Sequence, residues 1–486
     1  MKIHLIGFLL AVMAGTIPAI AQENKGDFDV FRKGLKDGFN TFRKKVLDDY
    51  DKYLDGVWHE YNAFRGEERS DTPKPRKAPV AQTKPEPPVA QSPILPKCPV
   101  ETSPANRPEI TIPALQSMPP NTNWAYFNFY GITVRVPTID VQGTTASSFP
   151  KDFAILWKQF SNSHIEKKVL PYFEEIIVEH GFNDWFTFEL IRAYVDSAFG
   201  TATSGLRIVL THYLLVHLGY DVRIGLKNDR QPMLLVAFKQ MVYARSYTIL
   251  SGQRYYSFYD NREDTNITEG FSFCTYDIPN DMDAGSAMDL LIRQDIEMPY
   301  SPHRYYFQHG NVKIEGEVNS NVIQMLYRYP QMPVGCYAKS MVNKNIHEKV
   351  AEQLRQQLTG MPRAEAVDTL LHFVQSAFQY ATDEEQHGFE KPYFFEETLF
   401  YPQCDCEDRS IFYSYLLWQV LEVENHLISY PGHECVAVHL DSAIHGCCYR
   451  YNDKEFYISD PTYIGSVTGM CMPAFLSERP EIELSR

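Results

Sequence analysis

A short stretch between residues 400 and 417, FYPQCDCEDRSIFYSYLL, combines two cysteines, three acidic residues and an arginine with an apolar run. The apolar spacing at Ile411, Tyr415 and Trp418 predicts a helix that faces a core, with Cys406 at its first turn. A thiol there meets the positive end of the helix dipole and unpaired backbone N–H groups, which lower its pKa and offer donors to an oxyanion. The neighbouring acids oppose a thiolate, so a nucleophile at this position requires a basic partner.

Two residues near the C-terminus could complete such a site. His433 follows a Pro-Gly turn and opens the alternating segment ECVAVHL, which predicts a strand. Asp460 ends a second strand-like segment, KEFYIS, where Pro461 stops it. If these two strands are antiparallel neighbours, the two side chains meet. Cys406, His433 and Asp460 could then act as a thiol nucleophile, its base and the residue that orients the base.

This pattern resembles the transglutaminase-like superfamily. In that family a cysteine opens a buried helix, a histidine opens the next strand, and an aspartate precedes a proline and a hydroxyl residue. The resemblance covers about residues 346–473, and one position departs from it, because Cys435 stands where the family usually has an aromatic residue. The matching positions are Cys406, Asp408, Ser410, His433 and Asp460.

The resemblance implies a papain-like α+β fold, in which the nucleophile helix packs on an antiparallel sheet. It implies that the Cys406 thiolate attacks a carboxamide or peptide carbonyl, that His433 protonates the leaving amine, and that Asp460 holds the imidazole tautomer. A thioester would form and be cleared by water or by a second amine. We therefore expect a cysteine-dependent hydrolase or transferase of protein or peptide substrates, with no cofactor and no metal. The alternative is a non-catalytic tandem binding or scaffold protein.

An earlier part of the chain repeats the order of helices, buried helix and strands. Aligning the buried helices at an offset of 202 places Ser204 at the position of Cys406. Aligning the strands at an offset of 200 places Met233 at the position of His433 and Asp260 at that of Asp460. Because methionine cannot act as a base, we expect a degenerate, catalytically silent copy.

The N-terminal region has a different character. An apolar run before Ala19-Ile20-Ala21 is typical of a secretory signal, so we expect an exported protein, periplasmic or extracellular, with no transmembrane span. Apolar residues then recur every 11 positions, which predicts one stripe on a long amphipathic helix that could self-associate as a coiled coil. The segment from 71 to 113 holds 12 of the 31 prolines and is typical of a linker that separates this helix from the globular part.

These patterns predict six segments along the 486 residues, in an α+β chain with transglutaminase-like cores. The formal net charge of −15 argues against nucleic acid as a partner. In the connecting segment, residues 311–318 and 321–329 are expected to form a hairpin. The segments are a signal peptide (1–21), an amphipathic helix (22–66), a Pro-rich linker (67–119), a degenerate transglutaminase-like domain (120–282), a β-rich connecting segment (283–345) and a transglutaminase-like catalytic domain (346–486).

Other roles for the nine cysteines and the nearby histidines stay open. Cys404 and Cys406 could bind zinc together with His445, Cys447 and Cys448, although C-x-C and adjacent cysteines fit structural zinc poorly. His445 is a rival base, and His439 is expected to be a packed or surface residue. The possible disulfide partners of Cys404 are Cys435, Cys447, Cys448 and Cys471.

Overall fold

The structure is a computed structural model, and it describes residues 74–81, 122–141, 150–227, 231–260 and 285–486. The predicted signal peptide, the amphipathic helix and most of the Pro-rich linker lie outside the described residues. The described residues form an α+β fold whose larger sheets are antiparallel, as the sequence predicts at this level. Among these residues, no helix has both the length and the apolar character that crossing a bilayer would require.

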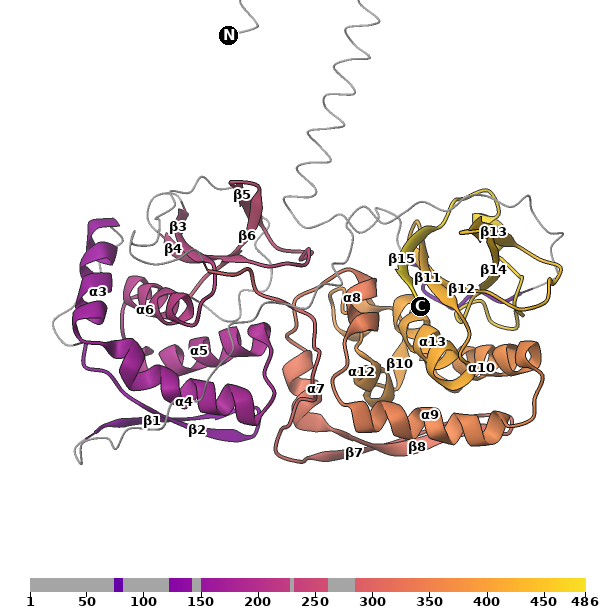
Figure 1. The fold of residues 1–486 in the computed structure, drawn as a ribbon, viewed down its shortest axis with the longest axis horizontal. Helices are drawn as coiled ribbons and strands as arrows, with labels where there is room; N and C mark the ends of the chain where they lie inside the picture. Colours follow the sequence, from indigo (N-terminus) through magenta and orange to yellow (C-terminus); the bar gives the residue numbers. More distant parts are fainter. Residues whose placement is uncertain (1–73, 82–121, 142–149, 228–230, 261–284) are drawn as a thin grey trace, which may run out of the picture. The chain divides into compact units, whose positions relative to one another are not determined.

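The first set of elements consists of a hairpin, a group of helices and a four-stranded antiparallel sheet (Figure 1). The sheet has the order β3-β4-β6-β5 and covers α6, whose side chains are buried on almost every side. An all-round apolar helix of this kind belongs in a core. The elements are β1 (Trp124–Phe129), β2 (Ile132–Pro137), α3 (Pro150–Asn162), α4 (Ile165–Glu179), α5 (Asp184–Phe199), α6 (Ser204–His217), β3 (Val222–Lys227), β4 (Gln231–Ala237), β5 (Tyr247–Leu250) and β6 (Gln253–Phe258).

A second hairpin, β7 (Pro302–His309) with β8 (Val312–Asn319), follows, and then two short helices, α7 (Ser320–Leu326) and α8 (Val334–Lys339). The prediction that residues 321–329 form a strand paired with 311–318 is therefore wrong. The Asn319 side chain accepts a hydrogen bond from the Asn321 backbone N–H and caps a helix instead. The apolar residues of α7 then face the core at helical spacing.

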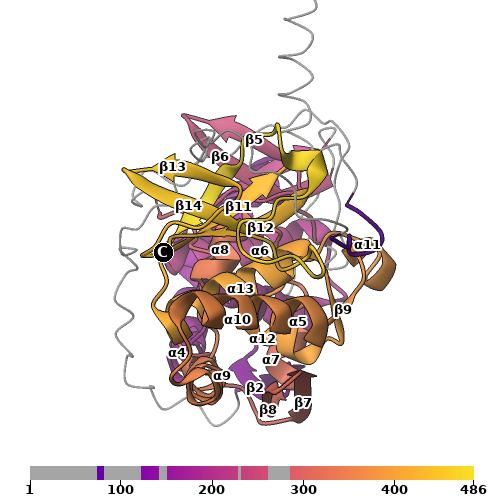
Figure 2. The same ribbon diagram turned by 90° about the vertical axis from the view of Figure 1, so that its right-hand side faces the viewer.

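The second set of elements carries the candidate site. Helix α13 (Cys406–Leu421) packs against a five-stranded antiparallel sheet with the order β13-β14-β12-β11-β15, as Figure 2 shows from the side. Both the start of α13 at Cys406 and the start of β12 at His433 agree with the sequence prediction. The other elements are α9 (Lys344–Leu358), α10 (Arg363–Ala377), β9 (Gln379–Tyr380), α11 (Asp383–Gln386), α12 (Phe395–Phe400), β10 (Gln403–Cys404), β11 (Asn425–Tyr430), β12 (His433–Val438), β13 (Cys448–Tyr451), β14 (Lys454–Ser459), η1 (Pro473–Phe475) and β15 (Glu481–Ser485).

The two larger sheets share one strand order. The order β3-β4-β6-β5 in the first corresponds to β11-β12-β14-β13 in the second, which gains β15 at its edge. In each set a buried helix, α6 or α13, directly precedes the strands. This repetition is what an internal duplication would produce.

The strand register changes one correspondence made from the sequence. Val236 on β4 pairs with Tyr256, and Val436 on β12 pairs with Ser459. If the two valines correspond, the position of Asp460 is occupied by the residue after Tyr256, which is Ser257. Asp260 instead accepts hydrogen bonds at 2.9 Å from Arg207 Nε, on α6. The alignment at one offset failed because β6 pairs with β4 in a different register from that of β14 on β12.

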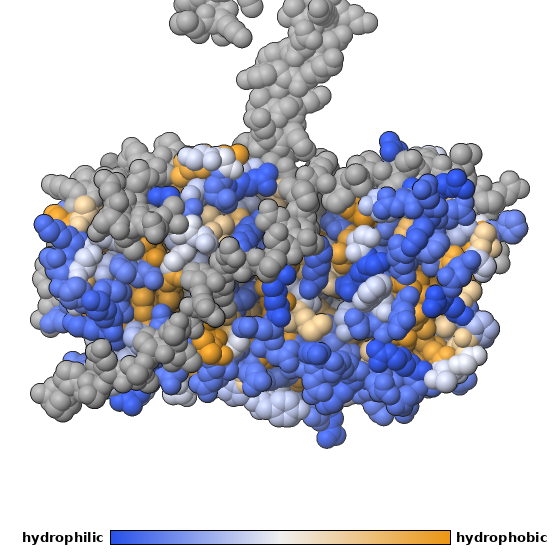
Figure 3. All heavy atoms as spheres, in the orientation of Figure 1, coloured by the Kyte–Doolittle hydropathy of each residue, from blue (hydrophilic) through white to orange (hydrophobic). Residues whose placement is uncertain are grey.

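The surface shown in Figure 3 is mostly hydrophilic, with hydrophobic residues in small separate areas.

Candidate active site

Helix α13 begins at Cys406, inside the protein. The Asp408 side chain accepts a hydrogen bond from the Asp405 backbone N–H at 3.2 Å, which caps the first turn, and another from the Tyr393 N–H at 2.8 Å. Cys406, Asp405 and Asp408 each have 0% of their surface exposed. The predicted nucleophile is thus held rigidly at a helix N-terminus and away from solvent.

His433 and Asp460 lie together, as the order of the strands predicts. The Pro431–Gly432 turn, in which Gly432 has a φ of 69°, places His433 at the first position of β12. Strands β12 and β14 are antiparallel neighbours, and Asp460 directly follows β14. His433 Nε2 donates to Asp460 Oδ2 at 2.8 Å.

Both members of this pair are fixed by further contacts. Asp460 Oδ1 accepts from the backbone N–H groups of Thr462 at 2.8 Å and Tyr463 at 3.2 Å. The His433 ring stacks on Phe475, with the ring centroids 5.2 Å apart and the planes 3° from parallel. His433 Nδ1 is buried and has no hydrogen-bond partner within the described part of the chain. Nε2 uses its N–H group in the hydrogen bond to Asp460. In the neutral ring, Nδ1 therefore has the free lone pair and can accept a proton.

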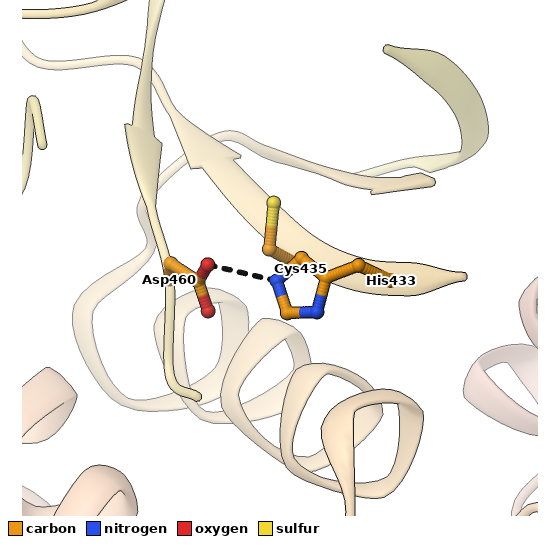
Figure 4. A group of neighbouring side chains, drawn as sticks. All are labelled: His433, Cys435 and Asp460. Carbon is orange, nitrogen blue, oxygen red and sulfur yellow. Dashed lines mark hydrogen bonds and ion pairs between the residues drawn. The ribbon is translucent and has the colours of Figure 1, made fainter. Parts of the chain in front are cut away.

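The thiol of Cys435 also belongs to this group, although no catalytic role was predicted for it from the sequence. Ligand atoms of His433, Cys435 and Asp460 all lie within 4.8 Å of one another (Figure 4). Side chains alternate along a strand, so Cys435 shares a face of β12 with His433. Burial raises the pKa of the Cys435 thiol well above its usual value, and the nearby Asp460 carboxylate raises it further. Cys435 is two residues after His433 in a segment predicted to be a strand, and this spacing could have identified it as a neighbour of the His433 side chain.

The structure does not bring Cys406 to His433. The Cys406 thiol donates to Glu407 Oε2 at 3.1 Å, and its neighbour on β12 is the backbone of Glu434. The face of β12 that packs toward α13 carries Val436 and Val438, whereas Cys435 and Ala437 belong to a separate apolar cluster on the other face. His433 alternates onto that other face, which explains why the Cys406 thiol meets the backbone of Glu434, the next residue, instead of the His433 ring.

Acidic side chains surround the Cys406 thiol. Burial raises its pKa well above the usual value, and the carboxylates of Glu407 and Asp405 raise it further, while the ammonium group of Lys74 lowers it. Burial also raises the pKa of Asp383 to about 6. The helix N-terminus therefore does not by itself yield a thiolate, which agrees with the prediction that a basic partner is required.

Lys74 is the cation at this point, although it comes from the segment expected to be a linker. Its Nζ lies 3.0 Å from Asp405 Oδ2 and 2.7 Å from Glu390 Oε1, and it also pairs with Glu407. Burial lowers the pKa of Lys74, but these three carboxylates outweigh it and raise the pKa well above its usual value. The expectation that the whole Pro-rich stretch only separates two parts is wrong for residues 74–81, because charge pairing fixes one end of them.

Among the remaining cysteines, the two thiols in contact are not the pair with Cys404 that was considered from the sequence. Cys404 is buried, and its sulfur lies 4.0 Å from the Gln379 carbonyl oxygen. Cys447 and Cys471 instead contact each other, and the hydrogen bond from the Cys471 thiol lowers the pKa of Cys447. The cysteines that the structure describes are all reduced.

Two compact groups contain the donor atoms that a metal ion would need. One is His433, Cys435 and Asp460, and the other consists of the carboxylates around Cys406, where Lys74 supplies a positive charge. Within the described ranges, Cys404 and Cys406 do not form a cluster with His445, Cys447 or Cys448, so the zinc arrangement considered from the sequence is not assembled.

The two other histidines lie outside the His433–Asp460 pair. His445 is exposed, in the connection between β12 and β13. His439 Nδ1 lies 3.0 Å from the Glu455 carbonyl oxygen, so this residue is packed at the end of its strand.

No protein-family model matches the chain, and no curated protein is similar to it. The geometry alone therefore carries the functional argument.

Proposed function

We propose that this protein is an exported cysteine-dependent amide hydrolase or acyltransferase with a transglutaminase-like, papain-like core. The observation that carries the proposal is the buried His433–Asp460 pair, in which one ring nitrogen is oriented by a carboxylate and the other is free. A buried polar atom without a partner costs about 1–3 kcal/mol, so such an atom calls for a functional reason.

In this proposal Cys406 is the nucleophile, His433 the general base and acid, and Asp460 the residue that orients the imidazole. His433 takes the thiol proton, and the sulfur attacks the carbonyl carbon of an amide. His433 then gives the proton to the leaving amine as the C–N bond breaks, leaving a thioester. Water or a second amine attacks that thioester and restores the thiol. Turnover requires the Cys406 thiol and His433 Nδ1 to approach each other.

Hydrolysis is the favoured outcome over transamidation. Water is abundant outside the cell, and transfer to an amine requires a site that shields the thioester from water. The substrate class is protein or peptide, since the acidic chain is unsuited to nucleic acid.

A non-catalytic binding or scaffold role is the second candidate, and one observation favours it. The Cys406 thiol is bonded to a carboxylate, and burial among acids raises its pKa. A tandem scaffold that keeps triad residues without turnover would tolerate this arrangement. The same proposal makes residues 120–282 a silent copy and gives the N-terminal amphipathic helix a role in self-association.

Replacing single thiols separates these possibilities. A glutamine-bearing protein with a fluorescent primary amine, and a peptide library in parallel, would report transfer and hydrolysis. Cys406→Ala should abolish both activities, whereas Cys404→Ala, which removes a buried thiol two residues earlier, should retain them. Activity lost only in Cys435→Ala would transfer the nucleophile's role to that residue. Activity absent from the wild type, or unchanged in every variant, would favour the scaffold.

A further inference from the structure

Residues 74–81, here called the strap, connect the two ends of the candidate site. Near one end, Tyr380 Oη donates to the Pro75 carbonyl oxygen at 2.8 Å. At the other end, Ile464 N donates to the Pro79 carbonyl oxygen at 2.8 Å, and Ala81 N donates to the Ile464 carbonyl oxygen at 3.0 Å. The strap thus pairs in parallel with the loop that follows Asp460.

The first residue of the strap fills an acidic site, which is formed by Asp405, Glu407 and Glu390. The side chains of Asp405 and Glu407 are 0% exposed, and that of Lys74 is 17% exposed. Asp405 Oδ1 is buried and has no hydrogen-bond partner in the described ranges, and the same holds for Oδ1 of the neighbouring Asp383. Even with Lys74 in place, this site has unused acceptor atoms for a cation.

The other basic residues nearby have different partners. Arg409 donates to the carbonyl oxygens of Gln375 and Phe378, at 3.2 and 2.8 Å. Lys391 Nζ pairs with Glu397 at 2.8 Å. The ammonium group in the acidic site is therefore supplied by the strap, from a position 331 residues before Asp405 in the chain.

We propose that the strap is a tethered copy of the peptide ligand of this site: the acidic site binds the ammonium group of a lysine, and Ile464 pairs with the extended backbone beyond it. The ligand class is a peptide of about eight residues, the length of the strap, with lysine at one end and the residue that pairs with Ile464 near the other. The inference rests on the proposed function for what happens to the bound peptide, but binding itself requires no turnover.

Two consequences follow from the charges. A peptide lysine in the acidic site would replace Lys74 beside Cys406, where a positive charge favours the thiolate. The strap also competes with any such peptide, because a tethered segment has an effective concentration on the order of millimolar. The intact chain should therefore bind the free peptide weakly.

The test measures binding of a fluorescent peptide, KPRKAPVA, which is the sequence of residues 74–81. Fluorescence anisotropy would compare the full chain, Lys74→Ala and the control Lys77→Ala, whose lysine is exposed in the same strap. We expect a Kd for Lys74→Ala at least about tenfold lower than for the other two proteins, because the tethered competitor has lost its ammonium group. A peptide with norleucine in place of its first lysine should lose this binding, whereas one with norleucine in place of its second lysine should keep it.

A second measurement does not depend on the folding of Lys74→Ala. With the wild type, excess lysine peptide should accelerate hydrogen exchange at the strap amides, including Ala81, whose N–H is bonded to Ile464. The norleucine peptide should leave that exchange unchanged. Equal binding of both peptides, or no binding to any form of the protein, would overturn the inference. Peptide binding without turnover would support the inference about the strap and contradict the proposed function. Turnover of lysine-free peptides would support the proposed function and contradict the inference about the strap.

Discussion

His433 Nε2 donates to Asp460 Oδ2 at 2.8 Å, and the opposite ring nitrogen, Nδ1, has no partner among the residues that the structure describes. Two backbone N–H groups hold the other carboxylate oxygen, so the aspartate fixes both the tautomer and the direction of the imidazole. This arrangement favours a base over a packed histidine.

Asp460→Asn tests the orienting role. The amide keeps the size of the side chain but can donate to Nε2, which moves the ring proton to Nδ1 and removes the free lone pair. We expect amide turnover to fall by about 10²–10⁴-fold, the usual contribution of general acid–base catalysis. The matched control is Asp453→Asn, an exposed residue in the β13–β14 turn, which should keep full activity. Equal activity in both variants would exclude the role given to Asp460.

The buried acid Asp383 predicts a dependence of stability on pH. Burial raises its pKa to about 6 from an ordinary value of 3.8, so the folded protein binds this proton more tightly than the unfolded chain. Its contribution to stability is therefore fully present below about pH 4 and is lost as pH rises through about 6. Denaturant unfolding at several pH values would compare the wild type with Asp383→Asn.

The advantage of Asp383→Asn over the wild type in free energy of unfolding should grow from pH 4 to pH 7. Glu384→Gln is the control, since Glu384 is the exposed neighbour on α11. An unchanged difference across this range would show that Asp383 titrates normally.

The contact between Cys447 and Cys471 predicts the disulfide that would form in an oxidising environment. Both thiols are buried and lie within hydrogen-bonding reach of each other, whereas Cys404 lies against Gln379. Peptide mapping without reduction, on protein purified from an oxidising compartment, should recover a peptide that links Cys447 to Cys471. A cross-link from Cys404 would contradict this pairing.

The cap of α7 predicts the cost of removing Asn319. Its Oδ1 accepts from the N–H groups of Ser301 and Asn321, and its Nδ2 donates to the Met298 carbonyl oxygen at 3.1 Å. Asn319→Ala should lower the free energy of unfolding by about 1–2 kcal/mol, the usual range for a helix cap. Thermal and denaturant unfolding would measure it, and Asn345→Ala, at an exposed position of α9, should cost less.

The sequence by itself determined the local elements that carry the site. The apolar spacing after Cys406 and the alternation after His433 predicted α13 and β12, although both elements are buried on almost every side. His433 opens β12 and Asp460 follows β14, and the antiparallel pairing of these two strands brings the two side chains together.

Only the tertiary structure decided which groups share an environment. The sequence could not show that His433 lies on the face of β12 with Cys435, because the side that α13 covers depends on how helix and sheet pack. Nor could it show that Lys74 binds beside Cys406. Composition makes a Pro-rich stretch a linker, and burial of its lysine becomes favourable only where three carboxylates, from distant positions in the chain, surround the ammonium group.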